Sequence, residues 1–221
     1  MIMIKFQNDK IIVFFGGIAH SLEQIQSEFM QENLHFKRIK QTHSDTVIEA
    51  NLAEETQADA HYTDRTNEAL LIATADCMPI MIYCEQTHRV AAVHAGWRGV
   101  ENKIIEKTIK KLINTGSNQK KFKFWVGPHI QQESFEVEAD VEKLLSKVHY
   151  GLKTEDFCSF KNKKYYINLQ KILEAQIQNT LGSVPDIVYL DIDTKTNPDY
   201  YSYRRDSHTK KRNLSFICLL S

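Results

Sequence analysis

Residues 70–112 read LLIATADCMPIMIYCEQTHRVAAVHAGWRGVENKIIEKTIKKL, and this stretch decides the fold class. It contains three apolar runs, at 70–74, 80–83 and 90–93, separated by short polar segments. Runs of this length are typical of buried strands. Over 104–112, apolar residues then recur every three or four positions with charged residues between them, which predicts an amphipathic helix. The stretch therefore predicts strands followed by a covering helix.

The same alternation of strand and helix patterns continues in both directions along the chain. An apolar run that ends at Gly16 predicts a strand, and Ser21 with Gln24 three residues later predicts a helix start with a capping box. The further expected elements are strands at 11–15, 46–50, 122–126, 187–190, 201–205 and 214–219, and helices at 21–29, 137–148 and 168–182. Because no linker or repeat interrupts the pattern, we expect a single α/β (mixed α+β) domain over 1–221, with mixed β-sheets flanked by helices.

Composition excludes several classes of protein. The chain has 221 residues, which is ample for a core, and its 28 basic and 28 acidic residues cancel. A balanced charge argues against a nucleic-acid partner, and the lack of a long apolar run argues against a membrane span or a secretory signal. The four cysteines form no CxxC pair, which favours reduced thiols. We therefore expect a soluble cytoplasmic protein, either a monomer or a small homo-oligomer.

Three polar segments are candidates for chemistry: QTHSD at 41–45, TADCMP at 74–79 and HAGWRG at 94–99. The second and third follow apolar runs, and ligands of α/β proteins commonly bind at strand ends. Taken singly, Cys77 fits an inert buried thiol and His94 fits a core histidine as well as a metal ligand. Their spacing matches no local zinc or protease motif, so the residues alone leave the chemistry open.

Together the three segments resemble the YfiH family, which is also called the laccase-domain or polyphenol oxidase family and includes YfiH-like purine nucleoside phosphorylases. A glutamine-x-histidine element, a TADC-P element and an HAGWRG element occur here in the family's order. Further matching segments are Ala58-Asp59-Ala60, Gly127-Pro128, Phe135-Glu136-Val137 and 201–206. Loops at 16–20 and 129–134 depart from the family pattern, so the resemblance indicates the metal more firmly than the substrate.

The resemblance implies a zinc site with His43, Cys77 and His94 as ligands and a fourth position for water or substrate. Two imidazoles and one thiolate are a ligand set typical of catalytic zinc, which lowers the pKa of bound water toward ~7. The implied reactions are phosphorolysis of purine nucleosides and deamination of adenosine. The expected substrates are adenosine, inosine and methylthioadenosine, together with phosphate.

Four further residues are candidates for catalytic roles. Asp59 or Asp76 could carry protons, and Arg98 and Arg205 could contact phosphate or substrate hydroxyls. Structural ion pairing is the alternative for both arginines.

Several other functions remain open. Copper is possible because two histidines and one cysteine also bind blue copper, and Met78 could be the axial ligand of a laccase-like polyphenol oxidase. The chain has no His-x-His pair, which argues against a multicopper cluster. Without a metal, Cys77 could be a nucleophile and His94 its base, as in a hydrolase. A zinc-stabilised interaction protein and a peptidoglycan-precursor editing factor are the remaining alternatives.

Overall fold

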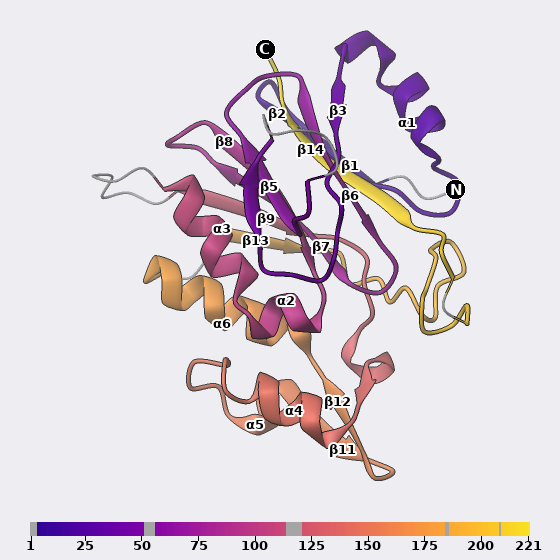
Figure 1. Cartoon of the computed structure of the whole chain (residues 1–221), viewed down its shortest axis with the longest axis vertical. Coiled ribbons are helices and arrows are strands. Elements are labelled where there is room, and N and C mark those ends of the chain that lie inside the picture. The colour runs from indigo at the N-terminus through magenta and orange to yellow at the C-terminus, as the bar shows by residue number, and fades with distance from the viewer. Residues whose placement is uncertain (1–3, 51–55, 114–120, 184–185, 208) are drawn as a thin grey trace.

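Two large β-sheets pack face to face in the parts of the chain that the computed structural model describes, residues 4–50, 56–113, 121–183, 186–207 and 209–221 (Figure 1). The first sheet has the strand order β1 (Ile4–Gln7), β2 (Ile11–Phe15), β14 (Asn213–Leu219), β6 (Glu68–Thr74) and β3 (His35–Lys37). The second has the order β13 (Asp186–Tyr189), β9 (Phe122–Val126), β7 (Met78–Cys84), β8 (Arg89–Ala95), β5 (Ala60–Thr63) and β4 (Val47–Glu49). Both are mixed, because β3, β4 and β13 each run parallel to a neighbour.

The core between the two sheets explains the continuous apolar run of β2. Val13 and Phe15 face the second sheet, where they pack in one buried cluster with Met81 and Trp125. Phe14 belongs to a separate cluster on the outer face of the first sheet. Because both faces of β2 are covered, all of its residues are apolar and buried instead of alternating with polar ones.

Helix α1 (Leu22–Glu28) covers the outer face of the first sheet. The predicted capping box is present: Ser21 Oγ accepts a hydrogen bond from the Gln24 backbone nitrogen, and Gln24 Oε1 accepts one from the Ser21 nitrogen. Ile25 of this helix then packs against the first sheet in the cluster that contains Phe14.

Other helices cover the outer face of the second sheet (Figure 1). They are α2 (Trp97–Glu101), α3 (Ile104–Leu112) and α6 (Leu169–Leu181). Below them lies what we call the lower lobe, residues 136–167. It contains β10 (Glu136–Val137), α4 (Ala139–Leu145), α5 (Thr154–Phe157), β11 (Cys158–Lys161) and β12 (Lys164–Ile167), whose strands form an antiparallel sheet. Short 3₁₀ helices lie at Met30–Glu32 and Gln132–Ser134. Among the described residues, no helix has the length and apolar character needed to cross a membrane.

The predicted α/β class, with mixed sheets flanked by helices, is confirmed. The strand expected at 201–205 is wrong: residues 201–202 have no regular structure and 203–207 form a turn, because the Asp206 carboxylate accepts a hydrogen bond from the Ser202 nitrogen and the Arg205 side chain binds nearby carbonyls. The helix expected over 137–148 is shorter and spans Ala139–Leu145. Val137 belongs instead to β10, where it pairs with Tyr165 of β12.

Gly127, which follows β9, lies at a close contact between the sheets. A Cβ atom there would lie 2.2 Å from Phe15 Cδ1 and 2.9 Å from Pro79 Cγ. We therefore expect Gly127→Ala to destabilise the protein by about 1–3 kcal/mol through overpacking, measured by denaturant unfolding. Gly99→Ala is the control, because its added methyl would lie no closer than 3.3 Å to any neighbour, with Ile104 Cγ2 at 3.3 Å and the His94 and Ser44 carbonyl oxygens at 3.7 Å. Equal unfolding midpoints for the two variants would contradict this packing.

Candidate metal centre

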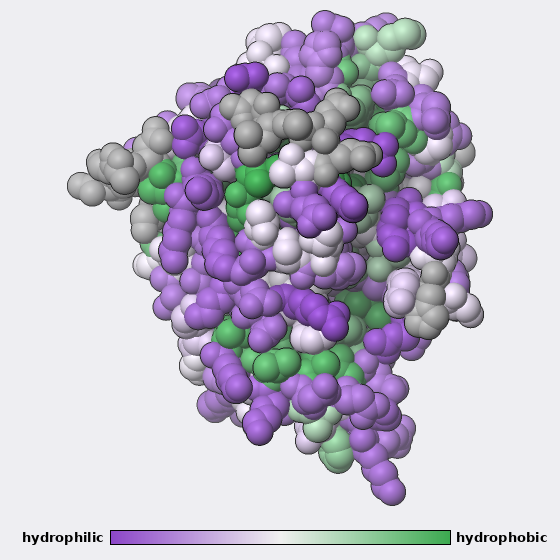
Figure 2. Space-filling model, in the orientation of Figure 1, coloured by the Kyte–Doolittle hydropathy of each residue, from purple (hydrophilic) through white to green (hydrophobic). Residues whose placement is uncertain are grey.

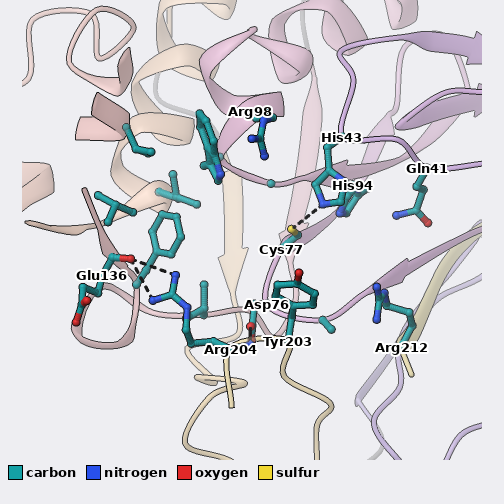
Figure 3. Close-up of a pocket in the computed structure, with 18 of the residues that line it drawn as sticks. Gln41, His43, Asp76, Cys77, His94, Arg98, Glu136, Tyr203, Arg204 and Arg212 are labelled. Atoms are coloured by element: carbon teal, nitrogen blue, oxygen red, sulfur yellow. Dashed lines mark hydrogen bonds between the residues drawn. The ribbon is translucent and has the colours of Figure 1, made fainter. Parts of the chain in front are cut away.

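Three residues distant in the sequence meet where the strands of the second sheet end (Figure 3). Cys77 directly precedes β7, and His94 lies in the paired strand β8, opposite Pro79. His43 comes from the loop before β4. Their potential ligand atoms all lie within 4.8 Å of one another, and Cys77 Sγ is 3.9 Å from His43 Nε2. The expected three-residue set is thus brought together in a group that could hold a metal ion.

Side chains around this group fix the segments that carry it. The Gln41 amide bonds both the nitrogen and the oxygen of Ala73 in β6, each at 2.8 Å, which ties the His43 loop to the first sheet. Asp76 has a left-handed backbone (φ 81), and its carboxylate accepts hydrogen bonds from Thr194 Oγ1 and the Arg204 nitrogen, each at 2.7 Å. The turn that presents the cysteine therefore has a defined conformation.

Without a metal, the charges within the group stabilise a Cys77 thiolate beside a protonated His94. Burial raises the pKa of the Cys77 thiol, but the positive charge of His94 and hydrogen bonding by His43 outweigh burial and lower the pKa to about 6. Burial lowers the pKa of His94, but Cys77 and Asp59 outweigh burial and raise it to about 9. Burial also raises the pKa of the Asp59 carboxyl, but hydrogen bonds from His94 and Ser44 hold it well below its usual range. The sulfur is therefore a thiolate at neutral pH, which is the form that binds metals.

The Gly96 backbone lies in close contact with two of the three residues. A Cβ atom at this position would lie 2.9 Å from Cys77 Sγ and 3.3 Å from His43 Cδ2. Two imidazoles and a thiolate are also a donor set that suits Zn²⁺ and other borderline-soft ions. The residues present therefore fit a bound metal ion.

Gly96→Ala tests this fit. The Gly96 backbone (φ −76, ψ 174) is accessible to alanine, so the only expected effect is steric pressure on Cys77 and His43. We expect the zinc affinity to fall about tenfold or more while the fold is retained, because a small misplacement of ligands weakens a metal site strongly. Competition with a chromogenic chelator measures the affinity, and circular dichroism checks the fold. Unchanged affinity would show that the ion does not bind beside Gly96.

A cavity of about 770 Å³ adjoins the group. Its apolar lining includes Trp97 of α2 and, from the side of the lower lobe, Phe135, Val137 and Val141. On the surface, hydrophobic side chains gather between the region of α2 and the lower lobe (Figure 2). Its polar lining includes Arg98, Arg204, Arg212, Asp76 and Tyr203. The cavity lining thus combines apolar and cationic side chains, as binding sites for small molecules commonly do.

The two candidate acids, Asp59 and Asp76, lie in different places relative to the cavity. Asp59 is fully buried and does not line the cavity; its carboxylate binds His94 and the loop that carries His43. Asp76 does line the cavity.

The two candidate arginines also differ. Arg98 lines the cavity, and its guanidinium carbon lies 4.3 Å from the Trp97 ring centroid. Among the described residues, no carboxylate forms a salt bridge with Arg98. Arg205 lies outside the cavity lining, bonds Asp206, and donates to the carbonyls of Thr194 and Tyr200. The geometry therefore supports the structural alternative for Arg205 and leaves Arg98 as the candidate for a substrate contact.

Two arginines of the cavity were not predicted from the sequence. Arg204 donates twice to the Glu136 carbonyl, and Arg212 donates to the carbonyls of Thr209 and Lys211. Arg212 ends a basic run that is typical of a solvated surface, so no local pattern singles it out.

Met78, the candidate axial copper ligand, is fully buried in the hydrophobic core and does not line the cavity. Its position gives no support to a blue-copper site.

Fold and site together define an α/β protein with a candidate three-ligand metal centre beside a large cavity. Residues 17–220 match the family described as multi-copper polyphenol oxidoreductase laccase; the chain belongs to this family, and its resemblance to YfiH proteins is confirmed.

Named relatives and a solved structure agree with this assignment. The chain is 30% identical to a purine nucleoside phosphorylase of Clostridium acetobutylicum, over 97% of this chain and 94% of that protein. It is 32% identical to the purine nucleoside phosphorylase YfiH of Shigella flexneri, over 74% of this chain and 65% of that protein. The crystal structure of YfiH from Bacillus licheniformis, 21% identical, matches with a TM-score of 0.82 over 95% of this chain and 92% of that one, which confirms the fold.

Proposed function

We propose that this protein is a zinc-dependent purine nucleoside phosphorylase that acts on adenosine, inosine and methylthioadenosine and also deaminates adenosine. The observation that carries the proposal is the meeting of His43, Cys77 and His94, with ligand atoms within 4.8 Å of one another, at the wall of a large cavity. The names of the relatives from Clostridium acetobutylicum and Shigella flexneri support the reaction class.

The three residues would hold the zinc ion through two imidazole nitrogens and one thiolate. When bound, zinc in such a set supplies a Lewis acid and lowers the pKa of water at an open position toward ~7. The chain's own part is to keep the ligands in place and to keep one side open. Asp59 fixes the ring of His94, and the cavity that the three residues line keeps one side open.

The two kinds of side chain in the cavity lining suit the two substrates of phosphorolysis. In that reaction a phosphate oxygen forms a bond to the ribose C1′ carbon, while the bond to the purine breaks and its electron pair goes to the base. The cationic side chains of Arg98 and Arg212 suit the phosphate dianion, and the apolar side chains of Phe135 and Val141 suit the flat purine. Of the two candidate acids, only Asp76 lines the cavity, so it is our candidate for proton transfer.

A second candidate function follows from one specific contact. The Asp59 carboxylate is 2.7 Å from His94 Nδ1, and His94 in turn interacts with the Cys77 thiol. Nucleophile, base and orienting acid occur in this order in metal-free thiol hydrolases. Activity that survives a chelator but is lost on thiol alkylation would favour this candidate over the zinc enzyme.

Product analysis tests the proposal. Zinc-loaded protein is incubated with adenosine, inosine or methylthioadenosine, with and without phosphate. We expect free base and the corresponding ribose 1-phosphate when phosphate is present, and inosine from adenosine when it is absent. Absence of turnover for all three nucleosides, with His43→Ala indistinguishable from the unmodified protein, would contradict the proposal.

A further inference from the structure

A single buried carboxylate contacts two of the three candidate ligands. Asp59 directly precedes β5 and is fully buried. Its Oδ1 atom lies 2.7 Å from His94 Nδ1 and accepts a hydrogen bond from the His43 backbone nitrogen at 3.0 Å. Its Oδ2 atom accepts from the Ser44 nitrogen at 2.6 Å and from Ser44 Oγ at 2.7 Å. The Thr42 nitrogen and Oγ1 also donate to Oδ2, at 3.1 and 3.4 Å.

The contact with His94 determines which ring nitrogen can bind a metal. An ionised carboxylate only accepts hydrogen bonds, so His94 Nδ1 must carry a proton. In the neutral ring, Nε2 then keeps its lone pair and is the nitrogen available as a ligand. The backbone strengthens this placement, because the His94 nitrogen donates to the Asp59 carbonyl at 2.8 Å. Asp59 therefore fixes both the ring orientation and the tautomer.

Asp59 also stabilises the backbone of the loop that carries His43. His43 has a left-handed backbone (φ 59), which residues other than glycine seldom adopt. The backbone nitrogens of Thr42, His43 and Ser44 all point at the Asp59 carboxylate. Successive N–H groups that surround one anion form a stable nest. The carboxylate therefore compensates for the unfavourable conformation of the ligand-bearing loop.

We propose that Asp59 is a positioning residue that assembles the metal centre by holding His43 and His94 at the same time. This role rests on the metal binding that is part of the proposed function. We assign Asp59 this positioning role instead of proton transfer, because the residue is enclosed by these contacts and does not line the cavity.

Asp59→Asn is the direct test. The amide has nearly the same shape but only one acceptor oxygen, so it cannot accept all of these hydrogen bonds, and its NH₂ group favours the wrong tautomer of His94. We expect zinc affinity to fall about ten- to a hundredfold, measured by chelator competition. In the cobalt-substituted protein, the thiolate-to-cobalt and d–d absorption bands should shift, because the ligand geometry changes.

Glu68→Gln is the matched control. Glu68, at the start of β6, is a second buried carboxylate that accepts a hydrogen bond, but from Thr63 Oγ1 and not from a candidate ligand or its loop, and it does not line the cavity. Glutamine has nearly the same shape as glutamate and keeps one acceptor oxygen. We expect the cobalt spectrum of this variant to match that of the unmodified protein. If Glu68→Gln and Asp59→Asn change the spectrum equally, the effect is a general result of removing a buried carboxylate and the positioning role is wrong.

The outcomes separate this role from the proposed function. If the unmodified protein binds neither zinc nor cobalt, both are overturned. If it binds zinc and Asp59→Asn binds it equally well, only the role of Asp59 is overturned.

A measurement on the unmodified protein covers the case in which Asp59→Asn does not fold. Long-range ¹H–¹⁵N spectra of the zinc-loaded protein should show the His94 proton on Nδ1. A proton on Nε2 instead would overturn the proposal.

Discussion

Cys77→Ser should abolish both zinc binding and nucleoside turnover. A serine hydroxyl stays protonated at neutral pH, whereas the thiol of Cys77 ionises readily beside two histidines, with its pKa lowered to about 6. Loss of a Lewis acid worth several kcal/mol corresponds to about a thousandfold or greater fall in kcat. Metal analysis of the purified variant and steady-state kinetics with inosine and phosphate measure the two effects.

Cys158→Ser provides the control for this substitution. Cys158 is a buried free thiol that starts β11 in the lower lobe and does not line the cavity. We expect this variant to bind zinc and to turn over inosine as the unmodified protein does. Equal losses in the two variants would point to a general effect of thiol removal, and full activity in Cys77→Ser would contradict the proposed centre.

Arg98→Ala should weaken phosphate binding selectively. Arg98 lines the cavity and stacks on Trp97, and among the described residues no carboxylate pairs with it. A charge-assisted hydrogen bond contributes about 1.5–3 kcal/mol, so we expect the KM for phosphate to rise about ten- to a hundredfold. Adenosine deamination uses no phosphate and should be nearly unchanged.

Two further variants sharpen this test. Arg98→Lys keeps the charge but loses the planar fork, so an intermediate KM is expected. Arg205→Ala should instead lower thermal stability, because its guanidinium binds the carbonyls of Thr194 and Tyr200 outside the cavity. A phosphate KM that is raised in Arg205→Ala and unchanged in Arg98→Ala would reverse our assignment of the two residues.

The sequence predicts the buried parts of the fold well. Continuous apolar runs identify β2, β6, β7 and β8, because each of these strands is covered on both sides. The hairpin of β11 and β12 is not predicted, because its strands are partly exposed and rich in lysine, tyrosine and serine. The strand expected at 201–205 fails for a different reason: the alternating Tyr-Ser-Tyr pattern is typical of a strand, but contacts of Arg205 and Asp206 hold a turn.

The candidate site is only partly predictable. Spacing alone does not bring His43, Cys77 and His94 together, because the contact depends on the pairing of β7 with β8 and on a distant loop. The resemblance to a family supplies that information. Arg204 and Arg212 come from the turn-rich segment before β14. The resemblance marks residues 201–206, but no local pattern shows that Arg204, and not Arg205, lines the cavity, and none indicates Arg212. The enclosed position of Asp59 is likewise a property of the folded chain.

Zinc titration of metal-free protein tests the central claim most directly. Phosphorolysis of inosine is followed as zinc is added in small steps to a known amount of chain. If His43, Cys77 and His94 form one catalytic metal centre, activity should rise linearly from near zero and stop rising at one zinc ion per chain. Full activity before any zinc is added, or a break at another ratio, would contradict the account.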